Sequence, residues 1–87
     1  MSKTTRLPAE ARRSLSEARK AVSRIRTPVE RLHAADALMR ALQSEIVEAA
    51  GIRRATIRDL YESGWTLTDL ANEFGITRPR ASQIINS

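Results

Sequence analysis

The chain has 87 residues, which allows one domain at most. Because a chain of this length buries only a small hydrophobic core, oligomerisation would add stability to it. It contains no cysteine, which excludes a disulfide framework and a cysteine-based zinc site. Its longest apolar runs are two or three residues, far short of the roughly 20 that a membrane span needs. The net charge of +5 is concentrated in residues 1–26, which carry eight basic and two acidic side chains, so this segment favours a polyanionic partner.

The composition favours an all-α fold. Three glycines, three prolines and one residue each of Phe, Trp and Tyr are fewer turn and aromatic residues than a sheet usually shows. Residues 1–7 hold no apolar pattern and are predicted to be a mobile basic arm. Residues 1–13 also lack the apolar stretch of a signal peptide, so we expect a cytoplasmic protein.

The first predicted helix covers about residues 8–25. Its apolar side chains recur at alternating steps of three and four residues, which is the spacing of one helix face. These side chains are Ala11, Leu15, Ala18, Val22 and Ile25. Thr27 followed by Pro28 then places an N-cap residue before a proline at the first helical position, so a second helix is predicted to start there.

The second helix is predicted to run unbroken from about 28 to 62. Its apolar stripe stays within a sector of roughly 100°, even across Gly51, although two helices broken at that glycine would fit as well. The stripe comprises Leu32, Ala35, Met39, Leu42, Ile46, Ala50, Ile57, Leu60 and Tyr61. Residues 8–62 are therefore expected to form a long helical hairpin. Because a core of this size cannot cover the whole stripe, we expect the hairpin to dimerise.

A short helix over 67–74 is predicted next. Gly64 suits the left-handed position that ends the preceding helix, and Thr66 is a favourable N-cap. Asp69, three residues after that cap, places a carboxylate where the helix dipole favours it. These signals define both ends of the connection between the two helices.

The last predicted helix covers about residues 78–86. Gly75 turns the chain, Thr77 provides the N-cap, and Pro79 fits the first turn, where a missing amide hydrogen costs nothing. The spacing therefore predicts two short helices joined by a tight glycine turn.

These two short helices resemble a bacterial helix-turn-helix motif. Eight positions match its pattern of apolar, small and turn residues: Leu67, Leu70, Ala71, Phe74, Gly75, Ile76, Ala81 and Ile84. The stretch from Gly75 to Ile84, GITRPRASQI, is also similar to the DNA-binding end of serine recombinases and to region 4 of bacterial sigma factors. The resemblance covers about residues 53–86 and implies a DNA-binding module over 53–87. In this motif the first helix crosses the DNA backbone and the second enters the major groove.

The last helix carries the predicted base contacts. Ala81 and Ile84 are expected to face the core, which leaves the polar side chains turned toward the groove. Arginine pairs with both acceptors of a guanine edge and glutamine with an adenine edge, so Arg78 and Gln83 are the predicted base readers. The remaining predicted base contacts are Ser82, Thr77, Pro79 and Asn86.

Predicted phosphate contacts flank this face. Arg80 lies toward its side, and Thr66 and Thr68 present donors at the start of the preceding helix. Arg54 and Arg58, just before the motif, are predicted to reach the DNA backbone as well.

The predicted function is sequence-specific binding of double-stranded DNA by a homodimer, as a transcriptional regulator of bacterial or phage type associated with the nucleoid. A plasmid partition protein that binds centromere repeats would use the same module. The sequence is also compatible with a protein-interaction adaptor that docks on RNA polymerase or another partner, and with a nonspecific nucleoid protein. It shows no catalytic set, so we expect no enzyme activity, no cofactor, no metal and no small-molecule ligand.

Overall fold

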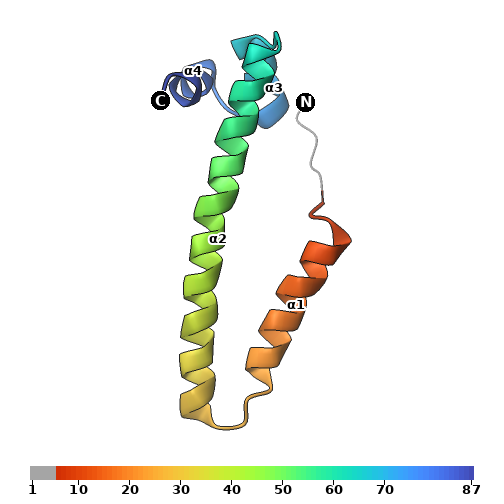
Figure 1. Cartoon of the computed structure of the whole chain (residues 1–87), viewed down its shortest axis with the longest axis vertical. Helices are drawn as coiled ribbons and strands as arrows, with labels where there is room; N and C mark the ends of the chain where they lie inside the picture. The colour runs from red at the N-terminus through yellow and green to blue at the C-terminus, as the bar shows by residue number, and fades with distance from the viewer. Residues whose placement is uncertain (1–5) are drawn as a thin grey trace. The chain divides into compact units, whose positions relative to one another are not determined.

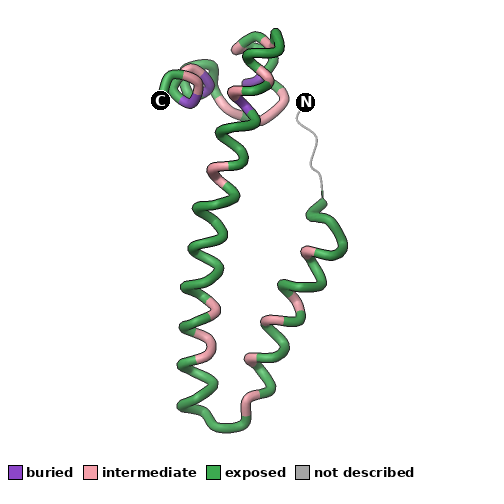
Figure 2. Tube along the Cα trace, viewed as in Figure 1, coloured by how far each residue is buried: buried purple, intermediate pink, exposed green. Residues whose placement is uncertain are grey.

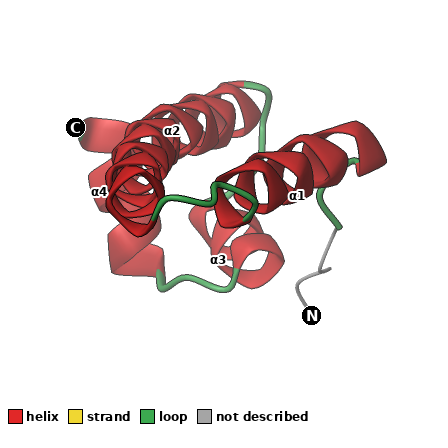
Figure 3. Ribbon diagram, turned by 90° about the horizontal axis from the view of Figure 1, so that it is seen from below, coloured by secondary structure: helices red, strands yellow, loops and turns green. Residues whose placement is uncertain are grey.

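A computed structural model describes residues 6–87, and residues 1–5 of the predicted arm lie outside the described range. The described residues form four helices: α1 (Ala9–Ser23), α2 (Pro28–Glu62), α3 (Leu67–Phe74) and α4 (Arg78–Asn86) (Figure 1). No strand occurs between residues 6 and 87, so the predicted all-α class is confirmed (Figure 3). Within the same residues, no helix is long and apolar enough to cross a membrane.

Helix α1 is slightly shorter than predicted. It starts after Pro8, whose carbonyl oxygen accepts a hydrogen bond from the Arg12 amide at 3.0 Å. It ends at Ser23, whose hydroxyl donates to the Lys20 carbonyl oxygen at 2.7 Å and so occupies an acceptor of the last turn. No side chain within Ala9–Ser23 is buried, and Leu15 remains 48% exposed.

Helix α2 is continuous from Pro28 to Glu62, as predicted, and passes through Gly51 without a break. A methyl group added at Gly51 would meet no atom within 4 Å, so the glycine is not required by a close neighbour. The described residues fall into two units, 6–47 and 48–87, and α2 contributes to both.

The unit of residues 6–47 has no buried residue. It holds α1 and the first part of α2, joined by residues 24–27. Large apolar side chains on this part of α2 stay in solvent: Leu32 and Met39 are each 62% exposed, and Ile46 is 66% exposed. The apolar stripes of the two helices therefore do not bury each other within this unit.

The core of the protein lies in the unit of residues 48–87 (Figure 2). Its centre is a cluster of Ile57 from α2, Leu70 from α3, and Ala81 and Ile84 from α4, each at most 1% exposed. Partly buried apolar side chains surround this cluster: Leu60, Trp65, Leu67, Phe74, Ile76 and Ile85. Burial of this surface is the main force that holds the end of α2, α3 and α4 together.

Candidate nucleic-acid interface

The connection between α2 and α3 is fixed by backbone hydrogen bonds. Gly64 has a φ of 115°, in the region that favours glycine, and its amide donates to the Tyr61 carbonyl oxygen at 3.1 Å. The Trp65 amide donates to the Leu60 carbonyl oxygen at 3.0 Å, and its side chain packs partly buried against the core. The turn therefore places Thr66 at the start of α3.

Thr66 and Asp69 form a capping box at this start. The Thr66 hydroxyl oxygen accepts from the Asp69 amide at 3.0 Å, and the Asp69 carboxylate accepts from the Thr66 amide at 2.9 Å. The bond from the Thr66 amide, and then the one with its side chain, lower the pKa of the Asp69 carboxyl.

The turn between α3 and α4 contains the left-handed glycine predicted from the sequence. Gly75 lies in the left-handed region at φ 65° and ψ 34°, and its amide donates to the Ala71 carbonyl oxygen. The amide of Ile76 donates to the same oxygen at 3.1 Å. Thr77 then caps α4 by accepting from the Arg80 amide at 3.1 Å. Both predicted caps and the predicted glycine turn are therefore present.

Helix α4 buries one face and exposes the other. Ala81 and Ile84 face the core, as predicted, and Ile85 is half-buried beside them. Six predicted DNA contacts on this helix and its cap are exposed, namely Thr77, Arg78, Pro79, Arg80, Gln83 and Asn86, and Ser82 is half-buried. The exposed surface of α4 contains two arginines and no carboxylate.

Hydrogen bonds link the polar side chains along α4. The Asn86 amide donates from Nδ2 to the Ser82 hydroxyl oxygen at 3.2 Å. Arg80 donates from Nη1 to Oε1 of Gln83 at 3.5 Å, which is at the long limit for such a bond. The amide group of Gln83 keeps both of its hydrogens for other acceptors, because only its oxygen is used in this contact.

Arg58 has a structural role that was not predicted from the sequence. Its guanidinium donates from Nε to the Ile84 carbonyl oxygen at 3.1 Å, and from Nη2 to the carbonyl oxygen and hydroxyl of Ser87 at 2.8 and 3.0 Å. The side chain thus binds the C-terminal end of α4, where unpaired carbonyls concentrate negative charge. Arg54, four residues earlier on the same side of α2, is exposed.

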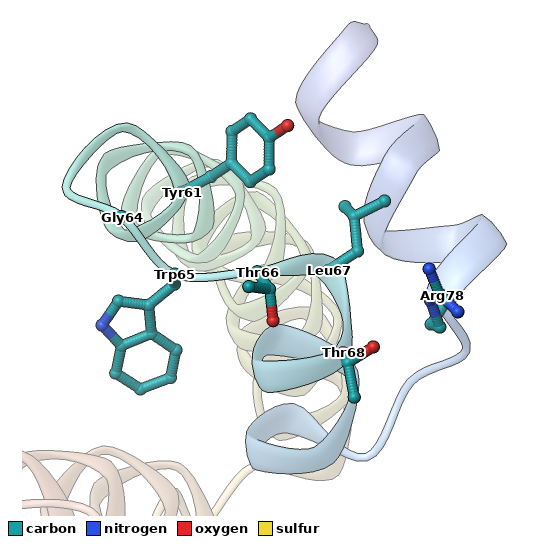
Figure 4. A pocket seen from close by; sticks show the side chains of 7 residues that line it. All are labelled: Tyr61, Gly64, Trp65, Thr66, Leu67, Thr68 and Arg78. Carbon is teal, nitrogen blue, oxygen red and sulfur yellow. The ribbon is translucent and has the colours of Figure 1, made fainter.

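Two hollows flank the start of α3, and they differ in charge. The first, here called the Arg78 hollow, brings the predicted base reader Arg78 together with the predicted phosphate contacts Thr66 and Thr68 (Figure 4). Its remaining lining is Tyr61, Gly64, Trp65 and Leu67. The second hollow contains Asp69 and Glu73 and no basic residue. Of these two hollows, the Arg78 hollow is therefore the one that carries a basic side chain.

Comparison of the chain with protein-family models, characterised proteins and solved structures gives no match. Among residues 6–87, no group of three or more His, Cys, Asp or Glu side chains is arranged to hold a metal ion.

Proposed function

We propose that the chain is a sequence-specific double-stranded DNA-binding protein in which residues 53–87 form a helix-turn-helix module. Helix α3 would cross the DNA backbone and α4 would enter the major groove, which is the arrangement this motif uses. Support comes from the common core of Leu70, Ala81 and Ile84 and from the left-handed Gly75 between the two helices.

The observation that carries this proposal is the exposed face of α4. A helix whose outer face holds arginine, glutamine and asparagine, and no carboxylate, suits a groove lined by base acceptors and flanked by phosphates. Arg78 is the first residue of α4. In this motif the N-terminal residues of the recognition helix contact the base edges. We assign base reading to Arg78 and Gln83, with Ser82, Thr77, Pro79 and Asn86 beside them.

Phosphate binding is assigned to the side chains around this face. Thr66 and Thr68 line the same hollow as Arg78, so a phosphate at that hollow would lie next to the edge of the recognition helix. Arg80 and Arg54 are exposed and are assigned to neighbouring phosphates. Arg58 is omitted from this set, because its guanidinium already binds the end of α4.

A dimeric transcriptional regulator is the proposed context. Two recognition helices spaced by about one DNA turn, roughly 34 Å, bind far more tightly than a single module. The exposed apolar side chains of Leu32, Met39 and Ile46 support an interface within the hairpin of residues 8–62. A plasmid partition protein that binds repeated sites would use the same arrangement.

The same exposed apolar surface favours a second candidate function, a protein-interaction adaptor. In that case the apolar face of α2 would bind another protein, and the exposed face of α4 would dock on protein rather than on DNA. The two functions differ in whether the chain binds a defined DNA site, so one DNA-binding experiment distinguishes them.

The test is selection of DNA ligands from a pool of random duplexes by the full chain, with sequencing after several rounds. The proposed function predicts a defined enriched site, bound at least about a thousandfold more tightly than random duplex. A chain that enriches no site, or that binds every duplex equally, would contradict sequence-specific recognition by α4. Gln83→Ala serves as the matched control, because it should reduce enrichment without unfolding the core.

A further inference from the structure

Helix α2 carries a row of exposed apolar side chains with heptad spacing. Leu32, Met39 and Ile46 follow one another at seven-residue intervals and are 62%, 62% and 66% exposed. Ala35, which is half-buried, and Leu42, which is 36% exposed, lie between them, so the row alternates in steps of three and four residues. We call these five residues the α2 seam. This spacing is that of the a and d positions of a coiled coil.

Residues 6–47 leave the large side chains of the α2 seam exposed. No residue of that unit is buried, and the neighbouring Val29 and Val47 are also exposed, at 64% and 67%. A contiguous apolar surface of this kind marks an interaction site in a soluble protein. The flanking charges indicate what binds there.

We propose that the α2 seam binds the seam of a second copy of the chain as a parallel two-stranded coiled coil. Leu32, Met39 and Ile46 occupy the a positions, and Ala35 and Leu42 occupy the d positions. Each side chain then meets its own counterpart across the dimer axis. The inference rests on the proposed function only in taking the chain to be a homodimer, and no step of it depends on DNA.

The charge pattern supports a second copy as the partner. Arg31 immediately precedes the first a position, so it is a g residue, and Asp36 immediately follows the first d position, so it is an e residue. In a parallel dimer a g residue faces the e residue five positions later on the other helix. Arg31 of each copy therefore faces Asp36 of the other, and the dimer contains this attractive pair twice. Within one chain Arg31 donates from Nη1 to the Ile25 carbonyl oxygen at 3.0 Å, which leaves the hydrogens on Nε and Nη2 for this pair.

The same pattern disfavours an antiparallel dimer. An antiparallel register that packs Leu32 against Leu42 of the other copy would bring Arg31 close to Glu45, but it would also place the two Asp36 carboxylates opposite each other. The parallel register has no such like-charged pair. It also places the C-terminal ends of both α2 helices, each followed by α3 and α4, at the same end of the coiled coil.

Cysteine cross-linking tests the orientation, because the natural chain contains no cysteine. In a parallel dimer, Met39→Cys and Leu42→Cys each bring two identical cysteines within disulfide reach, with Cα atoms about 6 Å apart. We expect both variants to form covalent dimers under mild oxidation. Ser44→Cys, on the opposite face of α2, is the matched control and should remain uncross-linked. A dimer that cross-links through neither residue 39 nor residue 42 would overturn the parallel arrangement.

Charge reversal tests the register. Arg31→Glu should weaken dimerisation about tenfold in sedimentation equilibrium, because each attractive pair becomes a repulsive one. The double variant Arg31→Glu, Asp36→Arg should restore it in a parallel dimer. In an antiparallel dimer the new glutamate would repel Glu45 and the two side chains at position 36 would still carry like charge, so dimerisation would stay weak. A chain that sediments as a 9.7 kDa monomer at micromolar concentration would overturn the inference. A cross-linked dimer that binds no DNA would contradict the proposed function and leave this inference intact.

Discussion

Arg58 of α2 donates a hydrogen bond from Nε to the carbonyl oxygen of Ile84 in α4, over 3.1 Å. The same guanidinium binds Ser87, whose hydroxyl also donates to the Ile84 carbonyl oxygen at 2.9 Å. The last carbonyls of a helix have no partner within the helix, so a cation at that end satisfies them and interacts favourably with the helix dipole. The long helix α2 therefore fixes the C-terminal end of α4 in addition to packing against its apolar face.

Arg58→Ala should lower the free energy of unfolding of residues 48–87 by about 1 kcal/mol, because it removes charge-assisted hydrogen bonds that are partly exposed to water. Urea unfolding followed by the fluorescence of Trp65, the single tryptophan, measures this change within the right unit. Arg54→Ala is the matched control and should leave stability unchanged while weakening DNA binding. Equal stability of the Arg58 variant and the natural chain would show that this contact does not hold α4.

Ala81→Leu should disrupt the core of the candidate module. Ala81 has no exposed surface and lies in the cluster with Ile57, Leu70 and Ile84, so a larger side chain overpacks the site at a cost of about 1–3 kcal/mol. We expect lower stability and loss of DNA binding, with α1 and most of α2 still helical by circular dichroism. Ala55→Leu, at an exposed position of α2, is the control and should have little effect. Unchanged stability of Ala81→Leu would mean that α4 does not pack as described.

The capping box predicts a pH dependence of stability. Hydrogen bonds from Thr66 lower the pKa of Asp69 in the folded chain, so the ionised carboxylate stabilises the fold above the ordinary aspartate pKa. This contribution begins to fall below the pKa of an ordinary aspartate, about 4, and it is lost once the pH has passed through the lowered pKa of Asp69. Asp69→Asn should therefore be less stable than the natural chain at neutral pH, and the difference should shrink in acid. A difference that is constant from pH 7 to pH 2.5 would contradict the role of the carboxylate.

Gly51→Ala should stabilise α2 by about 0.5–1 kcal/mol, because alanine loses less backbone entropy in a helix and a methyl group at this position meets no neighbour. Thermal unfolding followed by the helical signal at 222 nm measures the gain. A destabilised variant would indicate that a partner approaches α2 closely at Gly51.

Most of the helical layout was predictable because its signals are local. The caps at Thr66 and Thr77, the left-handed glycine at Gly75 and the stripe that continues across Gly51 each depend on residues close in the chain, and the structure has all of them. The inward positions of Ala81 and Ile84 were predictable for the same reason, since helical period alone sets them.

The features that depend on tertiary packing were not predictable. The stripe of α2 looks uniform in the sequence, yet Ile57 is fully buried and Ile46 is 66% exposed, because α3 and α4 cover only the end of the helix. Arg58 binds carbonyls 26 and 29 residues away, and no pattern in the sequence signals such a contact. The sequence also gives no signal that Arg78 and Thr68 line the same hollow.

Sequence-specific recognition by α4 is tested most directly by the affinity of Gln83→Ala for an enriched site and for random duplex, each measured across a series of salt concentrations. Gln83 is exposed on α4 and keeps its amide hydrogens free, so base reading predicts a loss of about 1–3 kcal/mol at the enriched site only, with an unchanged salt slope. Arg54→Ala should instead weaken both duplexes alike and flatten the slope of log affinity against log salt by about 0.9. An equal loss on both duplexes for Gln83→Ala would contradict base reading by α4.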